Sequence, residues 1–269
     1  MNNRQCVYIT GGSSGIGLGL AKVSAGSGAD IVLLARDQVK LDSAVAICSR
    51  LAVHADQVIA GLSLDIMDYD GLPARLLEAT ASYGAPDLVI LCAGVAGNGT
   101  FLNTPAAEFD SIVNINLGGS REVARALLPD MLKRGSGQVA FVSSMAGLIG
   151  LYGYSAYSAS KFALTGMVQA LRQELAGSGV SAHLVCPPEV NTPMIAAESR
   201  APVPQTRFLK DLVGTLEPAV AAQKIARSIA RGKSVIVPGV RANLMAWIAR
   251  HFPELFARSS ELLLRWRFK

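Results

Sequence analysis

The chain has 269 residues, of which 51% are hydrophobic and 17% are charged, and its formal net charge is +5. This composition excludes a disordered, collagen-like or other low-complexity protein, because the chain is too apolar and carries too few charges. The length is within the range of a single large α/β domain. The four scattered cysteines lack CxxC spacing, so we expect buried thiols, no metal site and a cytoplasmic location.

Short apolar runs alternate with helical patterns along the chain. Strands are predicted at residues 6–10, 31–35, 58–64, 87–92, 138–143, 181–185 and 234–237, and helices at 38–51, 69–83, 106–134 and 156–176. Continuously apolar strands separated by helices are typical of a parallel sheet covered on both faces. We therefore expect a doubly wound α/β (Rossmann) fold in one domain, residues 1–240, with residues 241–269 as a C-terminal extension. A proline-containing segment, residues 187–216, is expected to be irregular.

A glycine-rich turn at residues 10–17 joins the first predicted strand to a helical pattern that follows from Leu18. Glycines let the backbone approach a pyrophosphate closely, and free N–H groups at a helix N-terminus stabilise its charge. Such a turn alone is a weak signal, but its position between the first strand and the first helix is typical of a dinucleotide site. The expected contacts are Gly11, Ser13, Ser14, Gly15, Ile16 and Gly17.

The residues after the second predicted strand bear on the choice of dinucleotide. An acidic residue here would bind a ribose 2′-hydroxyl, whereas an arginine would accommodate a 2′-phosphate. Arg36 directly follows the strand, and Lys40 lies one helical turn further on, which places two cations near one point. Asp37 is better explained as a helix N-cap, although it is also the alternative ribose ligand. The pattern favours NADPH, bound through Arg36 and Lys40.

A second constellation consists of Ser144, Tyr157 and Lys161. Four-residue spacing on a helix places Tyr157 and Lys161 on one face, where the ammonium can lower the pKa of the phenol and make proton transfer feasible near neutral pH. Taken alone, the pair is equally compatible with a packed tyrosine beside a lysine that extends to solvent.

Combined, these motifs resemble the short-chain dehydrogenase/reductase family over nearly the whole chain. The resemblance implies a catalytic tetrad of Asn116, Ser144, Tyr157 and Lys161. It also extends the expected cofactor site to Asp65 near the adenine, to Val190 and Thr192 near the nicotinamide carboxamide, and to Ala93, Gly94 and Pro187. This chain departs from the family pattern in two places, with Cys92-Ala93-Gly94 in place of Asn-Ala-Gly and Pro187-Pro188 in place of Pro-Gly.

Within this family the segments around residues 35–41, 141–164 and 187–193 look like those of the 3-ketodihydrosphingosine reductases. That resemblance implies NADPH-dependent reduction of a long-chain 3-keto amine, although the N-terminal membrane segment of eukaryotic members is not expected here. A 3-oxoacyl or hydroxysteroid oxidoreductase is the alternative, and a non-catalytic NADP-sensing scaffold is an alternative of another class. Apolar residues of the predicted substrate loop, residues 188–216, either form a lid or cover the core: Met194, Ile195, Val203, Phe208, Leu209, Leu212 and Val213.

The positive charge is concentrated in the tail. Residues 241–269 contain six basic and two acidic residues, a net charge of +4, together with many leucines and aromatic residues. A basic amphipathic helix with aromatic residues is suited to an anionic membrane surface. A subunit interface is almost equally compatible, and a homo-oligomer is expected. Nucleic-acid binding is not expected, because the rest of the chain is nearly neutral and has no recognition motif.

Overall fold

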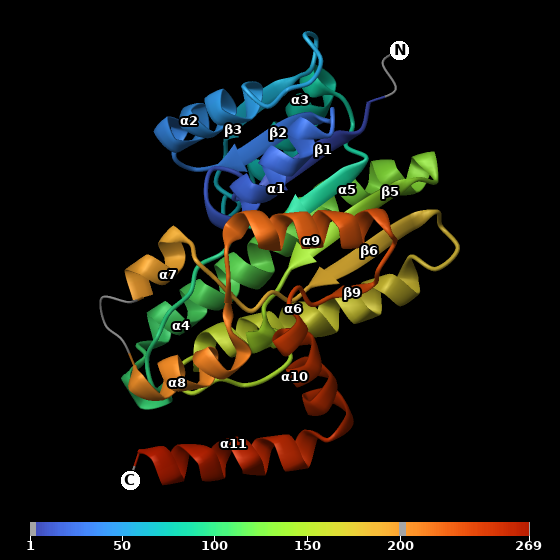
Figure 1. Ribbon diagram of the computed structural model, residues 1–269. Helices are drawn as coiled ribbons and strands as arrows, with labels where there is room; N and C mark the ends of the chain where they lie inside the picture. The colour runs from blue at the N-terminus through green and yellow to red at the C-terminus, as the bar shows by residue number, and fades with distance from the viewer. Residues whose placement is uncertain (1–3, 199–202, 269) are drawn as a thin grey trace.

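The computed structural model describes residues 4–198 and 203–268 (Figure 1). Seven strands form one parallel sheet in the order β3-β2-β1-β4-β5-β6-β9. The strands are β1 (Cys6–Thr10), β2 (Asp30–Ala35), β3 (Ile59–Ser63), β4 (Leu88–Leu91), β5 (Gly137–Val142), β6 (Val180–Val185) and β9 (Val235–Ile236). Each predicted strand overlaps one of these. The order reverses next to β1, where β2 lies on one side and β4 on the other, and this confirms the doubly wound fold.

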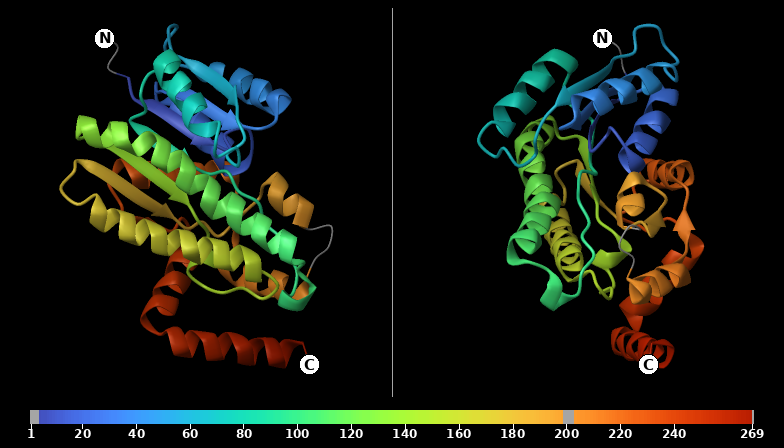
Figure 2. Two further views of the ribbon diagram at one scale, coloured as in Figure 1. Left: turned by 180° about the vertical axis from the view of Figure 1, so that it is seen from behind. Right: turned by 90° about the vertical axis from the view of Figure 1, so that its left-hand side faces the viewer.

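The strands are apolar throughout because helices cover both faces of the sheet. In β1, Val7 and Ile9 point to one buried cluster and Tyr8 points to the other. One face is covered by α1 (Gly15–Gly26), α2 (Gln38–Ser49) and α9 (Pro218–Ala230). The other is covered by α3 (Leu72–Tyr83), α5 (Ser120–Arg134) and α6 (Ser155–Glu174). The right-hand view of Figure 2 shows these two layers on either side of the sheet.

The structure corrects the single helix predicted at residues 106–134. Helix α4 (Ala106–Val113) is followed by a π-helical segment, Asn114–Gly119, and only then by α5. The insertion of π turns moves the residues that follow it around the helix axis, and such segments are frequent at functional sites. Asn116 lies within the segment and is fully buried.

The expectation of an irregular substrate loop is also wrong. The described part of residues 188–216 contains the strands β7 (Glu189–Val190) and β8 (Thr215–Leu216), which pair with each other, and the helices α7 (Pro193–Glu198) and α8 (Pro204–Val213). Residues 199–202 of this predicted loop lie outside the described residues. Two short 3-10 turns lie at Phe101–Asn103 and Met145–Gly147.

The tail forms two helices rather than one. Helix α10 (Val240–His251) is separated by Phe252 from α11 (Pro253–Arg267), which begins at Pro253 because proline is well suited to the first turn of a helix. Figures 1 and 2 show α11 extending beside the body of the molecule. Lys269, the last basic residue of the tail, lies outside the described residues. Within residues 4–198 and 203–268, no helix combines the length and the apolar character needed to cross a bilayer.

Candidate active site

A cavity of about 970 Å³ opens at the carboxyl ends of the central strands. Ligands of doubly wound sheets bind at this edge, next to the point where the strand order reverses. The cavity is lined by the glycine-rich turn, the loop after β4, the loop after β5, the start of α6, the β7–α8 region and both tail helices. It therefore unites segments that are far apart in the sequence.

The glycine-rich turn has the shape that a dinucleotide requires. Gly11 has φ of +66° and lies against the backbone of Ala93, so a larger residue would be both strained and too close. A Cβ on Gly17 would collide with the Gly11 carbonyl oxygen. Five of the six predicted contacts of this turn line the cavity: Gly11, Ser14, Gly15, Ile16 and Gly17. Ser13 belongs to the same turn but is not part of the lining.

Two further segments line the cavity beside the glycine-rich turn. Ala93 and Gly94 follow β4, and Thr10 ties this loop to β1 because its Oγ1 accepts from the Cys92 and Ala93 N–H groups at 3.0 and 3.1 Å. The cavity is also lined by Pro187, Val190 and Thr192. These residues and the glycine-rich turn surround one space, so they fit a bound nicotinamide dinucleotide.

Three other predicted cofactor residues lie outside the cavity lining. Arg36 is exposed directly after β2, at the same sheet edge. Asp37 is the N-cap of α2, as the sequence predicts, because its Oδ1 accepts from the Lys40 N–H at 3.1 Å. Lys40 Nζ is also 3.0 Å from Asp37 Oδ2, so Lys40 is already paired. Asp65 is exposed, and its Oδ1 accepts from the Met67 N–H at 3.0 Å.

Tyr157 and Lys161 lie one turn apart on α6, and both line the cavity. The Lys161 Nζ is 5.5 Å from the centre of the Tyr157 ring and donates to the Val142 carbonyl at 3.0 Å. Burial lowers the pKa of Lys161 to about 8, because the charged form is poorly solvated inside the protein. This lysine is therefore a buried group that titrates near physiological pH, unlike a lysine that extends to solvent.

Ser144 faces the same space from the end of β5. Its Oγ accepts from the Ala146 N–H at 3.1 Å, which begins the short turn after β5. The preceding Ser143 is hydrogen-bonded to α6, because its hydroxyl donates to the Lys161 carbonyl at 3.1 Å. The segment that carries Ser144 is thus tied to the helix that carries Tyr157 and Lys161 by the buried hydrogen bond from Ser143 to Lys161.

Asn116 is not part of the cavity lining. Its Oδ1 accepts from the Val95 N–H at 2.8 Å, and its Nδ2 donates to the Val95 carbonyl at 2.9 Å and to the Ser160 Oγ at 3.0 Å. Both amide hydrogens are used, so the side chain ties the loop after β4 to α6. In this structure Asn116 supports the segments that carry Gly94 and Lys161.

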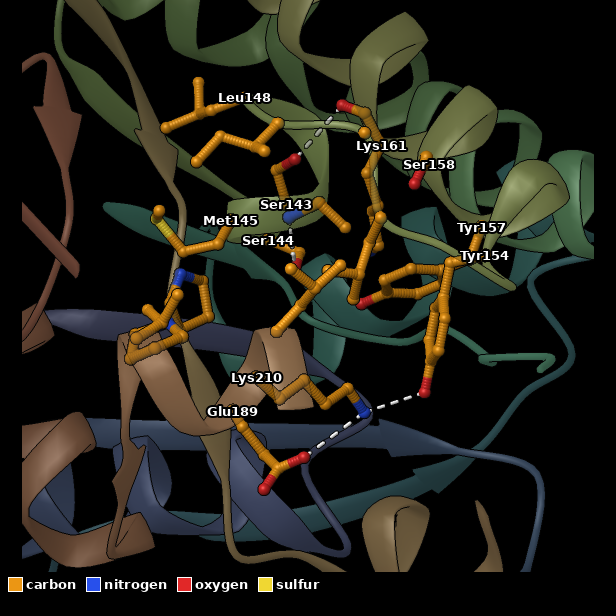
Figure 3. A pocket seen from close by; sticks show the side chains of 18 of the residues that line it. Ser143, Ser144, Met145, Leu148, Tyr154, Tyr157, Ser158, Lys161, Glu189 and Lys210 are labelled. Carbon is orange, nitrogen blue, oxygen red and sulfur yellow. Dashed lines mark hydrogen bonds and ion pairs between the residues drawn. The ribbon is translucent and has the colours of Figure 1, made fainter. Parts of the chain in front are cut away.

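Sequence reasoning missed a polar cluster beside Tyr157. The Glu189 side chain is only 4% exposed, and its Oε1 accepts from Arg207 and Thr215, each at 2.9 Å. Its Oε2 lies 3.2 Å from Lys210 Nζ, which donates to the Tyr154 hydroxyl at 2.7 Å. The Tyr154 ring packs edge-on against Tyr157, with 5.6 Å between their centres. Figure 3 shows Lys210 between Glu189 and Tyr154.

The charge of Glu189 is maintained by its partners. Burial raises the pKa of this carboxyl, but hydrogen bonds from Arg207, Thr215 and Lys210 outweigh burial and hold the pKa below its usual value. No pattern in the sequence could have predicted this cluster, since Glu189 and Lys210 belong to different elements, β7 and α8, with the helix α7 between them.

Comparisons with known proteins agree with this fold. The short chain dehydrogenase family model matches residues 5–202. A curated 3-ketodihydrosphingosine reductase from Bos taurus is 35% identical over 227 residues, which cover 84% of this chain and 68% of the relative. A short-chain dehydrogenase from Streptomyces avermitilis has a TM-score of 0.80 at 28% identity, covering 99% of this chain and 98% of the other. A structure from Burkholderia phymatum in complex with NAD has a TM-score of 0.81 at 23% identity, covering 94% and 95% of the two chains.

The fold, the site and the family match together define the class of this protein. The chain belongs to the short-chain dehydrogenase family. It is therefore an oxidoreductase that uses a nicotinamide cofactor, and the non-catalytic alternative is not favoured. The chain is similar to the 3-ketodihydrosphingosine reductases over most of its length.

Proposed function

We propose that this enzyme reduces the ketone of a long-chain 3-keto amine to a secondary alcohol with NADPH. The observation that carries the proposal is the single cavity in which Ser144, Tyr157 and Lys161 lie at one end and apolar side chains of α8, α10 and α11 at the other. The polar end could bind the reacting group of such a substrate, and the apolar end could bind its long chain. The name of the Bos taurus relative supports the same substrate class.

The chemistry follows from the groups at the polar end. The cofactor supplies a hydride to the carbonyl carbon when it is bound. The Ser144 hydroxyl donates a hydrogen bond to the carbonyl oxygen and orients it toward Tyr157. The Tyr157 phenol donates its proton to that oxygen as charge develops there. The Lys161 ammonium stabilises the negative charge that remains on Tyr157, and it would also help to hold the nicotinamide ribose of a bound cofactor.

The choice of NADPH rests on Arg36. This guanidinium is exposed immediately after β2, at the sheet edge where a dinucleotide ribose lies in doubly wound folds. Asp37, the rival ligand for a 2′-hydroxyl, is already used as an N-cap and as the ion-pair partner of Lys40. Arg36 is therefore the cation available to a 2′-phosphate.

We also propose that tail residues 241–269 bind peripherally to the cytoplasmic face of a membrane. Exposed apolar side chains on both tail helices accompany the basic residues, and they include Leu244, Trp247, Leu255, Leu262 and Trp266. A lipid surface would also be the source of a water-insoluble substrate. The competing explanation is contact with a second copy of the chain.

A substrate panel tests the proposed reaction. NADPH oxidation is measured with a long-chain 3-keto amine, a 3-oxoacyl thioester and a steroid ketone under identical conditions. We expect the highest kcat/KM for the keto amine, and a preference for either other substrate would contradict the proposal. The Tyr157→Phe variant is the control, because it removes only the phenolic proton and should lose nearly all turnover while NADPH affinity stays close to wild type.

A further inference from the structure

Helix α11 has two different apolar faces. Phe256, Leu263 and Leu264 are half-buried and line the same cavity as the catalytic residues. Leu255, Leu262 and Trp266 form a second stripe and are 63%, 64% and 76% exposed. Leu262 and Leu263 are neighbours in sequence, but only Leu263 lines the cavity, whereas Leu262 is mostly exposed, so they belong to different faces.

The inner face of α11 is held over the cavity at both ends. At its start, Pro253 follows α10 directly, and α10 contributes Met245 and Ala249 to the cavity lining. Beyond its last turn, the Phe268 ring packs edge-on against Phe208 of α8, with 5.9 Å between the ring centres. Figure 1 shows α11 below α8, joined to the body through α10.

The space between these helices is lined mainly by apolar side chains, together with Lys210 of α8 and Ser259, Ser260 and Glu261 of α11, and belongs to the same cavity as the reaction centre. Leu209, Leu212 and Val213 of α8 line it on one side, and Leu148 and Ile149 after β5 connect it to Ser144. The inner side chains of α11 border the cavity and are only half-buried. An apolar ligand in this concave site would bury the parts of these side chains that are still exposed.

We propose that the inner face of α11 is the far wall of a subsite for the unbranched hydrocarbon chain of the substrate, so that this helix sets the chain length that the enzyme prefers. The inference rests on the proposed reduction of a long-chain ketone and deepens it. The ketone lies at Ser144 and Tyr157, and its chain extends between α8 and α10 toward Leu263. The outer stripe of α11 does not contact the chain.

Adjacent leucines supply a matched pair of variants. Leu263→Trp adds bulk on the inner face, whereas Leu262→Trp adds the same bulk on the outer stripe. The kcat/KM is measured for 3-keto amines of eight to eighteen carbons in mixed micelles of fixed composition. In the wild type each methylene that enters the subsite should raise kcat/KM about fourfold until the subsite is full, which corresponds to about 0.8 kcal/mol per buried CH₂.

We expect Leu263→Trp to lower the ratio of kcat/KM for the longest and shortest substrates at least tenfold. Leu262→Trp should keep the wild-type ratio, because a change in micelle binding through the outer stripe affects every chain length alike. Equal ratios in the two variants would overturn the inference. A binding measurement separates this inference from the proposed reaction. By calorimetry, dodecylamine should bind the wild type more tightly than hexylamine, and Leu263→Trp should reduce that difference.

If dodecylamine shows the expected preference but no long-chain keto amine is reduced, the proposed reaction is wrong and the chain subsite stands. If dodecylamine binds no better than hexylamine, the subsite is wrong whatever the turnover. Circular dichroism of both variants shows whether α11 is still helical. If Leu263→Trp loses helicity, Phe256→Ala is measured in its place. This variant removes a ring from the inner face and so enlarges the subsite, which should shift the preferred chain length upward.

Discussion

At the scale of single residues, the site depends on buried groups whose protonation the fold controls. Lys161 is buried in α6 beside Tyr157, and this burial makes its ammonium much easier to deprotonate than that of an exposed lysine. The charge that stabilises a tyrosinate is therefore present at neutral pH and is lost in mildly alkaline solution. A second cation, Arg36, acts from the surface and is expected to select the cofactor.

The pKa of Lys161 predicts the pH dependence of reduction. Below pH of about 8 the side chain is an ammonium, and above it the side chain is a neutral amine. Because only the ammonium stabilises charge on Tyr157, kcat/KM for ketone reduction should fall by up to tenfold per pH unit above that value. A pH profile from 6 to 10 measures this fall. A flat profile up to pH 10 would mean that the charge of Lys161 is not required.

Arg36 is predicted to discriminate between the two cofactors. Replacing Arg36 with glutamine removes a charge-assisted contact to the 2′-phosphate, and such contacts contribute about 1.5–3 kcal/mol. The Kd for NADPH should therefore rise roughly 10- to 100-fold while the Kd for NADH changes little. Lys40→Ala is the comparison, and its effect should be smaller because Lys40 is paired with Asp37. Equal losses of affinity for NADPH and NADH would indicate that Asp37 binds the ribose instead.

At the scale of elements, Glu189 links α8 to β7 by hydrogen bonds and ion pairs. This carboxylate sits on β7 next to Val190, and it contacts Arg207 and Lys210 of α8 and Thr215 of β8. The same helix supplies Leu209, Leu212 and Val213 to the substrate half of the cavity. The position of the substrate wall is thus coupled to the segment expected to contact the nicotinamide.

Glu189→Gln tests whether the charge of Glu189 holds α8 in place. The variant keeps an acceptor for Arg207 and Thr215 but loses the charge that pairs with Lys210, so α8 should be held less firmly. We expect KM for the long-chain ketone to rise severalfold with a smaller change in kcat. Asp211→Asn is the matched control, because Asp211 is the exposed partner of the same Arg207, and exposed pairs contribute about 0–1 kcal/mol. Similar kinetic changes in both variants would show that Glu189 has no special role.

At the scale of the whole molecule, the tail combines a cavity wall with an exposed basic and apolar surface. Deleting residues 241–269 should reduce sedimentation with anionic vesicles and lower activity on long-chain ketones more than on short soluble ones. High salt should weaken vesicle binding of the full chain, because charge attraction is screened over about 8 Å at physiological ionic strength. If truncation instead changes the mass in solution while neither form binds vesicles, the tail is a subunit interface.

The sequence alone determined the features that depend on local patterns. The positions of the seven strands follow from short apolar runs, because strands buried on both faces carry few polar residues. The glycine-rich turn, the Asp37 N-cap and the Tyr157–Lys161 pair are likewise local, since each depends on residues at most seven positions apart.

Only the tertiary structure decided which distant groups meet. The pairing of Glu189 with Lys210, the use of the Asn116 amide to hold Val95 and Ser160, and the two faces of α11 all depend on contacts between separate elements. The helical content of residues 188–216 also escaped prediction, because prolines and short apolar runs indicate a loop until neighbouring elements supply burial and hydrogen bonds. A local pattern specifies what an element can bury, whereas the packed fold specifies against which partner it is buried.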